Sequence, residues 1–181
     1  MDRIEARKLA AEKPKKETTV RHLISVEGVM RALARRFGED EELWGQVGLF
    51  HDLDQDETGD DAHRHAYLAA EWLREAGADK RVVNGVLAHA HEQYRTGLMS
   101  KAVVHADAVA GLLVAAALVR PEKATGMKVS SVKKKLKEKA FAPGVNRDEV
   151  TSVEESIGIP LDEFFAVSIE GLQSVAADIG L

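Results

Sequence analysis

The dipeptide His51-Asp52 directly follows the apolar segment 43–50. A neutral imidazole beside an ionised carboxylate packs poorly in a core, but both groups are good ligands for a divalent metal ion. Helices that converge on such a pair can supply the remaining ligands from distant positions in the chain. The dipeptide therefore predicts a helical metalloprotein whose site carries out hydrolysis.

Further ligands are expected from histidines and aspartates elsewhere in the chain. The minimum set is His22, His51, Asp52 and Asp107. Two imidazoles and two carboxylates balance a divalent charge and suit Mn, Fe, Co, Ni or Zn better than Ca, which prefers oxygen throughout. His65 and His89 could complete a second site, with Asp52 bridging two ions. Two ions about 3.5–4 Å apart can generate hydroxide and clamp a phosphoryl group.

Several histidines occur in closely spaced pairs, and helix geometry separates the members of each pair. Residues two apart on an α-helix point about 200° away from one another. His63 and His65 are therefore not expected to share a site, and neither are His89 and His91. His63 and His105 are assigned to the surface or to a supporting role.

The choice within each pair follows from the neighbouring residues. His65 is preferred because small residues follow it and allow close helix packing, and His89 because it continues an apolar helix face. His91 is the reserve ligand, since the helix is expected to unwind there. Taken alone, each signal is also typical of an ordinary histidine or of a hydrogen-bonded pair near a helix end. The prediction of a metal site depends on all of these histidines and aspartates occurring together in this order along the chain.

Chain length, net charge and composition exclude some classes of protein for this sequence. A chain of 181 residues suits one domain with a single core. A net charge of -5 and a pI near 5.8 argue against a general nucleic-acid binder. The lysine cluster 133–139 lies opposite apolar residues at helical spacing and has no aromatic platform, so a solvated amphipathic helix is expected there, with a phosphate-recruiting patch as the alternative.

The cysteine count, the N-terminal residues and the longest apolar stretch predict a cytoplasmic, soluble protein without membrane contact. The chain has no cysteine, which excludes disulfides, thiolate zinc sites and a cysteine nucleophile. Residues 1–5 are charged, unlike a secretion signal. The apolar stretch 109–119 is well short of the roughly 20 residues that span a bilayer.

Apolar residues recur mostly at helical spacing, which predicts a compact, all-α, multi-helix globule. The expected helices cover residues 4–12, 20–37, 40–52, 63–76, 79–91, 100–120, 130–140, 146–157 and 161–179. Thr18 or Thr19 is expected to cap the second helix and Gly38 to end it. The acidic segment 54–61 predicts a loop that could bind a cation by itself, although it lacks the spacing of an EF-hand.

At its candidate ligands the chain resembles the HD-domain superfamily of metal-dependent phosphohydrolases. The family pattern is a histidine, a His-Asp pair and a distant aspartate, here His22, His51-Asp52 and Asp107. The segment 48–54 is similar to the His-Asp-Ile-Gly variant, with Leu53-Asp54 in place of Ile-Gly. Small, stand-alone HDIG-type proteins are also similar over the segment 106–135. His65 and His89 match the additional histidines of two-metal members.

The resemblance covers roughly residues 20–120 and implies an all-α core that hydrolyses phosphate esters. It divides the chain into an N-terminal helical extension (1–19), an HD-type metal-binding core (20–121) and C-terminal helices packed on the core (122–181). The Gly-Tyr-Pro motif of HD-GYP cyclic dinucleotide phosphodiesterases is absent after His89, so that activity is not expected.

The chemistry expected of the site is attack of a metal-activated water on phosphorus. Asp52 is the expected catalytic residue, since it would both bind the metal and orient the water. Glu92, Arg95 and Lys101 are candidate substrate contacts because they lie near the ligands in sequence. Lys101 is the preferred phosphate contact, and solvated surface charge is the alternative for all three.

Two other functions remain open from the sequence. Some six-ligand HD-type proteins use a mixed-valent di-iron pair to activate oxygen, and the ligand count permits that here. A non-enzymatic, metal-dependent interaction module is the third hypothesis. The expected partner is a small phosphorylated substrate rather than nucleic acid or a membrane. The Ala- and Leu-rich segment 106–119 is compatible with a homodimer and equally with a buried core helix.

Overall fold

The computed structural model describes residues 1–181 and contains only helices and connecting turns, so the all-α prediction is confirmed. The first helices are α1 (Arg3–Glu12), α2 (Glu17–Phe37), α3 (Glu41–Phe50), α4 (Gln55–Thr58), α5 (Tyr67–Glu75), α6 (Lys80–Ala90) and η1 (Glu92–Tyr94). They are followed by α7 (Leu98–Leu118), α8 (Val129–Lys137), α9 (Arg147–Thr151), α10 (Val153–Ile157), α11 (Leu161–Val175) and η2 (Ala176–Ile179).

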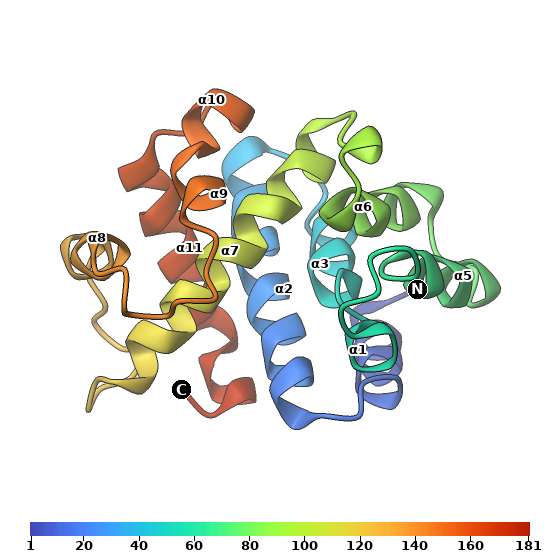
Figure 1. The fold of residues 1–181 in the computed structure, drawn as a ribbon, viewed down its shortest axis with the longest axis horizontal. Helices are drawn as coiled ribbons and strands as arrows, with labels where there is room; N and C mark the ends of the chain where they lie inside the picture. The colour runs from blue at the N-terminus through green and yellow to red at the C-terminus, as the bar shows by residue number, and fades with distance from the viewer.

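Two long helices, α2 and α7, form the centre of the molecule. α1, α3, α5 and α6 lie on one side of them, and α8 to α11 lie on the other (Figure 1). α7 contacts α2, α3, α6 and most of the C-terminal helices, and α2 packs most extensively on α3 and α11. These contacts bring residues that are distant in sequence to the interior between α2, α3, α6 and α7.

α7 is long and apolar enough to cross a membrane by length and composition alone. It is also longer than the apolar stretch 109–119 that stands out in the sequence. About 67% of its most apolar window is buried inside the fold. Packing at the centre of the protein therefore accounts for the apolar character of α7.

The close packing of α2 against α11 depends on two glycines. A Cβ added to Gly171 would lie 2.5 Å from the carbonyl oxygen of Gly28, and one added to Gly28 would lie 2.4 Å from that of Gly171. Real Cβ atoms do not approach backbone oxygens so closely, so both positions require glycine. This contact fixes the position of α2 against the C-terminal helices.

α1 is held to α2 by a buried cluster of charges. The carboxylate of Glu27 is fully buried and accepts hydrogen bonds from Arg3, Arg7 and Arg31. Arg31 also donates two hydrogen bonds to Glu42 at the start of α3. Buried carboxylates are tolerated when their oxygens are satisfied in this way.

The observed helix boundaries differ from the prediction at α2 and in the acidic segment. α2 begins at Glu17, and neither Thr18 nor Thr19 caps it; the hydroxyl of Thr19 donates to Asp56 instead. Gly38 does end the helix, in the left-handed conformation. The segment 54–61 contains the short helix α4 rather than only a loop.

The acidic residues after Asp52 already have partners in the protein. Asp56 accepts hydrogen bonds from the backbone amides of Lys15 and Lys16, and Glu57 pairs with Lys15. The segment therefore contacts the turn between α1 and α2, and its carboxylates do not converge on one another as cation ligands would.

Two further predicted helices have different boundaries in the structure. The helix expected from His63 begins only at Tyr67, so both His63 and His65 lie in a turn. The helix expected over 146–157 is two short helices, α9 and α10, which meet at Ser152. Asn146 caps the first of them by accepting hydrogen bonds from two backbone amides.

Candidate metal centre

Five separate segments each place a histidine or an aspartate at one point between the central helices. The residues are His22 in the second turn of α2, His51 and Asp52 at the end of α3, His65 in the turn before α5, His89 in the last turn of α6 and Asp107 in the middle of α7. All six are residues that the sequence predicted as ligands.

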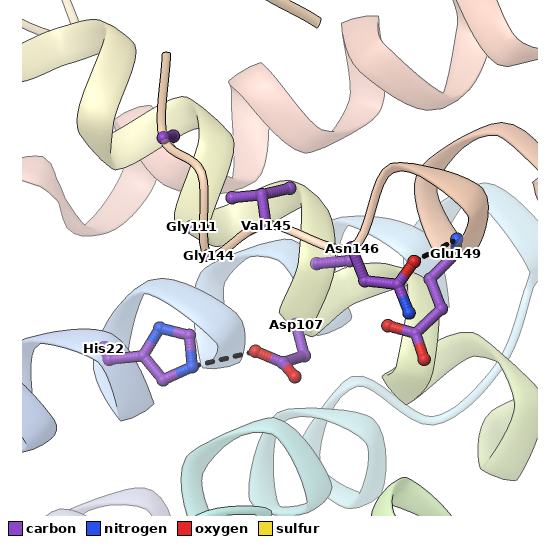
Figure 2. Close-up of a pocket in the computed structure, with 9 residues that line it drawn as sticks. His22, Asp107, Gly111, Gly144, Val145, Asn146 and Glu149 are labelled. Atoms are coloured by element: carbon purple, nitrogen blue, oxygen red, sulfur yellow. Dashed lines mark hydrogen bonds and ion pairs between the residues drawn. The ribbon is translucent and has the colours of Figure 1, made fainter. Parts of the chain in front are cut away.

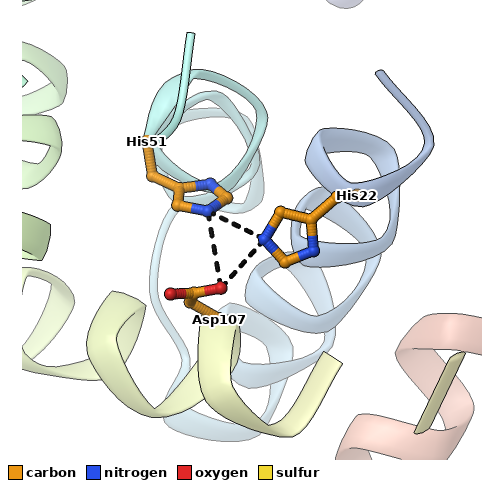
Figure 3. A group of neighbouring side chains, drawn as sticks. All are labelled: His22, His51 and Asp107. Atoms are coloured by element: carbon orange, nitrogen blue, oxygen red, sulfur yellow. Dashed lines mark hydrogen bonds and ion pairs between the residues drawn. The ribbon is translucent and has the colours of Figure 1, made fainter. Parts of the chain in front are cut away.

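His22, His51 and Asp107 form one half of the cluster (Figure 3). The Nε2 atom of His22 lies 2.9 Å from Oδ1 of Asp107 and 3.2 Å from Nε2 of His51. Nε2 of His51 is 3.6 Å from the same Asp107 oxygen. Three potential ligand atoms therefore face one another across a small space.

Asp52 joins this half to the other histidines. Its Oδ2 atom lies 3.6 Å from Nε2 of His51, while its Oδ1 atom lies 3.3 Å from Nε2 of His65 and 3.7 Å from Nε2 of His89. Asp107 is divided similarly, since its Oδ2 atom is 3.4 Å from Nε2 of His89. Each carboxylate thus presents one oxygen to each half of the cluster.

Close packing of α3 on α2 brings His51 next to His22. A Cβ on Gly48 would lie 2.7 Å from the backbone oxygen of Val26, so only glycine allows the helices to approach this closely. The carbonyl of Gly48 also accepts a 2.8 Å hydrogen bond from Nδ1 of His51. This bond places the proton on Nδ1 and leaves the lone pair of Nε2 directed into the cluster.

The turn that carries His65 is held by two contacts. Nδ1 of His65 lies 3.0 Å from Oδ1 of the buried Asp54, and Nε2 of His91 is 3.0 Å from the backbone oxygen of His65. The next residue, Ala66, has a φ of 63°, which is uncommon for a residue with a side chain. The strained turn lets His65 face the cluster just before α5 begins.

The charges of the cluster favour a cation. Burial alone would lower the pKa of His51, but the carboxylates of Asp52 and Asp107 outweigh it and raise the pKa to about 9. In the same way, Asp52 and Asp54 overcome burial and raise the pKa of His65 to about 9. The site attracts positive charge, and in the absence of a metal ion that charge is supplied by protons.

The two carboxylates are held in their ionised form by the same neighbours. Burial favours the neutral acid, but the adjacent imidazoles of His22, His51 and His89 lower the pKa of Asp107 well below its usual value. Burial likewise opposes ionisation of Asp52, whereas His51 and His65 lower its pKa below the usual range. Two ionised carboxylates at the centre of four imidazoles fit a divalent transition metal.

The remaining histidines do not join the cluster. His63 is exposed, and the ring of His91 stacks on Tyr67 with the ring centroids 4.3 Å apart. Nδ1 of His105 hydrogen-bonds the backbone oxygen of Glu149. The structure therefore places His89, not His91, at the cluster. Helix geometry was the wrong reason for separating His63 from His65, because both lie in a turn.

Of the three predicted substrate contacts, Arg95 lies beside a candidate ligand, and the other two lie at the protein surface. The guanidinium of Arg95 donates to the backbone oxygens of Ala88 and His89, so it supports the end of α6. Glu92 and Lys101 are exposed. Lys101 precedes Asp107 by six residues, a rotation of about 240° around α7, so it faces another direction.

A cavity of about 380 Å³ opens on His22 and Asp107 (Figure 2). Its far wall is the segment 142–149, which includes Asn146 and Glu149. Burial and the nearby charge of Asp107 raise the pKa of Glu149. The sequence gives no sign of this wall, because only the packing of α9 on α7 brings it to the site.

Asp54 is a further functional position that the sequence does not reveal. Its pattern groups it with the acidic loop, but its side chain is fully buried and accepts a 3.0 Å hydrogen bond from the backbone amide of Ala69 in addition to its contact with His65. Its position two residues after Asp52, where the HDIG variant has glycine, was the available signal.

Comparison with known families gives a direct match. The family model described as HD domain matches residues 19–126, more than half of the chain. The chain belongs to the HD domain family. The matched region contains all six residues of the cluster, and the family supports a divalent metal as the group that they hold.

Curated relatives of this HD domain protein match over about half of the chain. The chain is 30% identical over 90 residues to ribonuclease Y 2 of Levilactobacillus brevis and 30% identical over 91 residues to ribonuclease Y of a Sulfurovum species. Each alignment covers 50% of this chain, but only 17% and 18% of the respective relative. The chain thus spans less than a fifth of the length of these relatives. No solved structure matches significantly.

Proposed function

We propose that this HD domain protein is a metal-dependent phosphohydrolase that acts on a small phosphorylated metabolite or nucleotide. The observation that carries the proposal is the convergence of four imidazoles and two carboxylates from five segments beside a cavity. Membership of the HD domain family supports the reaction class. The cavity is of a size that admits a small ester.

The cluster is suited to hold one or two ions. His22, His51, Asp52 and Asp107 would hold the first, and His65 and His89 would hold the second with oxygens shared from the carboxylates. A bound divalent ion would polarise the phosphoryl oxygens and lower the pKa of an attacking water molecule. Mn, Fe, Co, Ni and Zn all accept this mixture of nitrogen and oxygen donors.

Asp52 is the residue best placed to direct the reaction. Its two oxygens face different halves of the cluster, and the end of α3 holds it beside His51. It can therefore orient a water molecule for in-line attack while it contributes to metal binding. Loss of this carboxylate would remove both contributions.

The surrounding residues fix the direction of the imidazoles. Gly48 and Asp54 each take the hydrogen bond of an Nδ1 atom, which leaves Nε2 of His51 and His65 for the metal. The ester would enter from the side of His22 and Asp107, whose side chains are 28% and 27% exposed. The side chains of His65 and His89 in the other half of the cluster are only 15% and 12% exposed.

The test is phosphate release by protein reconstituted separately with Mn, Fe, Co, Ni and Zn, measured over a broad panel of phosphate esters. Asp52→Ala should abolish release while the circular dichroism spectrum stays unchanged. His63→Ala, which alters an exposed histidine outside the cluster, should retain full activity. Equal activity in Asp52→Ala and the unaltered protein would reject the proposal.

A di-iron oxygenase is the second candidate, and one observation favours it. Both Asp52 and Asp107 divide their oxygens between the two halves of the cluster, as carboxylates that bridge two ions do. Oxygen consumption together with a mixed-valent EPR signal would support this function. An active zinc form would count against it.

A non-enzymatic interaction module would be favoured by a site sealed from solvent. Here the cavity reaches two of the candidate ligands, His22 and Asp107. The accessible site favours an enzyme over such a module.

A further inference from the structure

A second cavity, of about 280 Å³, lies beside the metal-centre cavity and differs from it in chemistry. Its apolar lining is supplied by Val114, Ala115, Leu118, Ile179 and Leu181. We call it the apolar groove. It runs between the start of α2, the C-terminal half of α7 and the end of the chain, which lie together in Figure 1.

The apolar groove is continuous with the metal centre. His22 and Gly111 line both cavities. On α7, Asp107, Gly111, Ala115 and Leu118 follow one another at intervals of four, four and three residues, so they lie along one face of the helix. This face leads from the metal-binding carboxylate directly into the groove.

Gly111 keeps the passage between the two cavities open. A Cβ at this position would lie 3.4 Å from a methyl group of Val145 in the opposite wall, and a longer side chain would fill the space between them. Figure 2 shows Gly111 and Val145 above His22 and Asp107, at the border of the metal-centre cavity. A ligand bound at the metal centre can therefore extend past Gly111.

The linings of both cavities suit an uncharged, non-aromatic chain better than a nucleotide. Neither cavity is lined by Phe, Tyr or Trp, on which a base would stack. Arg21 is the single Lys or Arg in either lining, and it lines the apolar groove rather than the metal-centre cavity. A di- or triphosphate would need more cationic partners than this.

The far end of the groove leaves apolar surface in contact with water. Leu118 is 65% exposed, in a protein with few large apolar side chains at its surface. A ligand that covers Leu118 would remove this surface from water, which is favourable. The occupant should thus be apolar and long enough to reach from Gly111 to Leu118.

We infer that the substrate is a phosphate monoester with an apolar carbon chain, whose phosphoryl group lies at the metal centre and whose chain lies in the apolar groove. The inference rests on the proposed function and narrows its substrate class. It assigns Gly111, Ala115 and Leu118 to substrate specificity, outside the metal ligands.

The direct test is the binding of hexylphosphonate and methylphosphonate to the Mn-loaded protein, measured by isothermal titration calorimetry. Both compounds present a phosphoryl group on a C–P bond, so the measurement does not depend on ester hydrolysis. Each methylene buried in the groove should tighten binding about fourfold. Hexylphosphonate should therefore bind at least about tenfold more tightly than methylphosphonate.

Two variants should weaken this preference, and a third should not. Ala115→Leu shortens the groove and should reduce the ratio of the two dissociation constants several-fold. Leu118→Asn acts at an exposed position, so the protein should still fold, and it should reduce the ratio as well. Val119→Asn is the matched control, since Val119 is 63% exposed on the same helix end but does not line the groove.

Three results would overturn the inference. The first is equal binding of the two phosphonates. The second is binding of adenosine 5′-monophosphate that is tighter than that of hexylphosphonate and that Ala115→Leu leaves unchanged. The third is conversion of a dimer to a monomer by Leu118→Asn with no effect on the preference for hexylphosphonate. Release of phosphate from hexyl phosphate is measured in parallel. Preferential binding of hexylphosphonate without phosphate release from hexyl phosphate would reject the proposed hydrolase activity and support the apolar groove as a binding site. Phosphate release without any chain-length preference would support the hydrolase activity and reject the groove.

Discussion

The buried carboxylate of Asp54 lies 3.0 Å from Nδ1 of His65 and accepts the backbone amide of Ala69 with its other oxygen. It therefore connects the end of α3, the turn before α5 and the first turn of α5. Because Nδ1 of His65 donates to this carboxylate, it is Nε2, facing Asp52, that gains the lone pair when the ring becomes neutral. An aspartate outside the cluster thus determines whether one of the candidate ligands can bind a metal.

Asp54→Asn should weaken metal binding without unfolding the protein. The amide oxygen can still accept from Ala69, but the amide nitrogen would then donate to Nδ1 of His65 and favour the proton on Nε2. Loss of such a supporting hydrogen bond typically costs about 10- to 100-fold in metal affinity. Metal titration followed by mass-spectrometric metal analysis should show selective loss of the ion next to His65.

Asp60→Asn is the control for this variant, because Asp60 is exposed in the same segment. It should bind metal as the unaltered protein does. If Asp54→Asn retained the full stoichiometry and affinity, His65 would not depend on Asp54 for its tautomer.

Metal binding should release protons and become tighter as the pH rises. His51 and His65 have pKa values of about 9 in the metal-free protein, so both rings are protonated at pH 7.5. Each ring must lose its Nε2 proton before it can bind a metal. Calorimetry in buffers with different ionisation enthalpies should detect up to two protons released per protein, and the apparent affinity should rise until about pH 9.

In the metal-free protein, the same protonation should make stability depend on pH. A histidine pKa that is raised on folding adds stability that is complete below the unfolded value of about 6.5 and is lost as the pH rises through the folded value. For His51 and His65 the folded value is about 9. Urea denaturation in the presence of a chelator should therefore show decreasing stability from pH 6.5 to pH 9, whereas a pH-independent midpoint would contradict the assignment.

The sequence predicts features that depend on neighbouring residues better than those that depend on tertiary contacts. Gly38 and Asp40 end α2 and begin α3 as expected, because capping is local. The positions of the candidate ligands could be read from the His-Asp pair and its spacing. The turn at Ala66 could not be predicted, because its positive φ is stabilised by contacts with distant residues.

The wall of the metal-centre cavity could not be predicted from the sequence either. Asn146 and Glu149 follow Asp107 by about forty residues, and no motif connects them to it. Only the packing of the C-terminal helices on α7 places them at the site. Residues that reach a site only through such packing can be identified only from a structure.

Removal of the Glu27 charge should strongly destabilise the fold. Glu27→Gln would leave Arg3, Arg7 and Arg31 facing an uncharged, fully buried amide. Loss of one partner from a buried ion pair costs about 3–5 kcal/mol. Chemical denaturation should show this decrease in the free energy of unfolding, accompanied by easier proteolysis of α1.

Glu17→Gln provides the comparison, since Glu17 forms an exposed pair with Arg21 one turn away on the same helix. An exposed pair of this type contributes about 0.3–0.5 kcal/mol. Similar losses in the two variants would show that the buried position of Glu27 adds nothing to stability.

Gly171→Ala should disturb the metal centre from a distance. The new Cβ would lie 2.5 Å from the backbone oxygen of Gly28, so α11 and α2 must separate. Overpacking of this kind costs about 1–3 kcal/mol. Because α2 also carries His22, the displacement should lower metal affinity in addition to the free energy of unfolding. Gly97→Ala adds a methyl group with no atom within 4 Å, outside the metal-centre cavity, and should leave both quantities nearly unchanged. If Gly171→Ala lowered stability but bound metal normally, the position of His22 would be independent of the contact between α2 and α11.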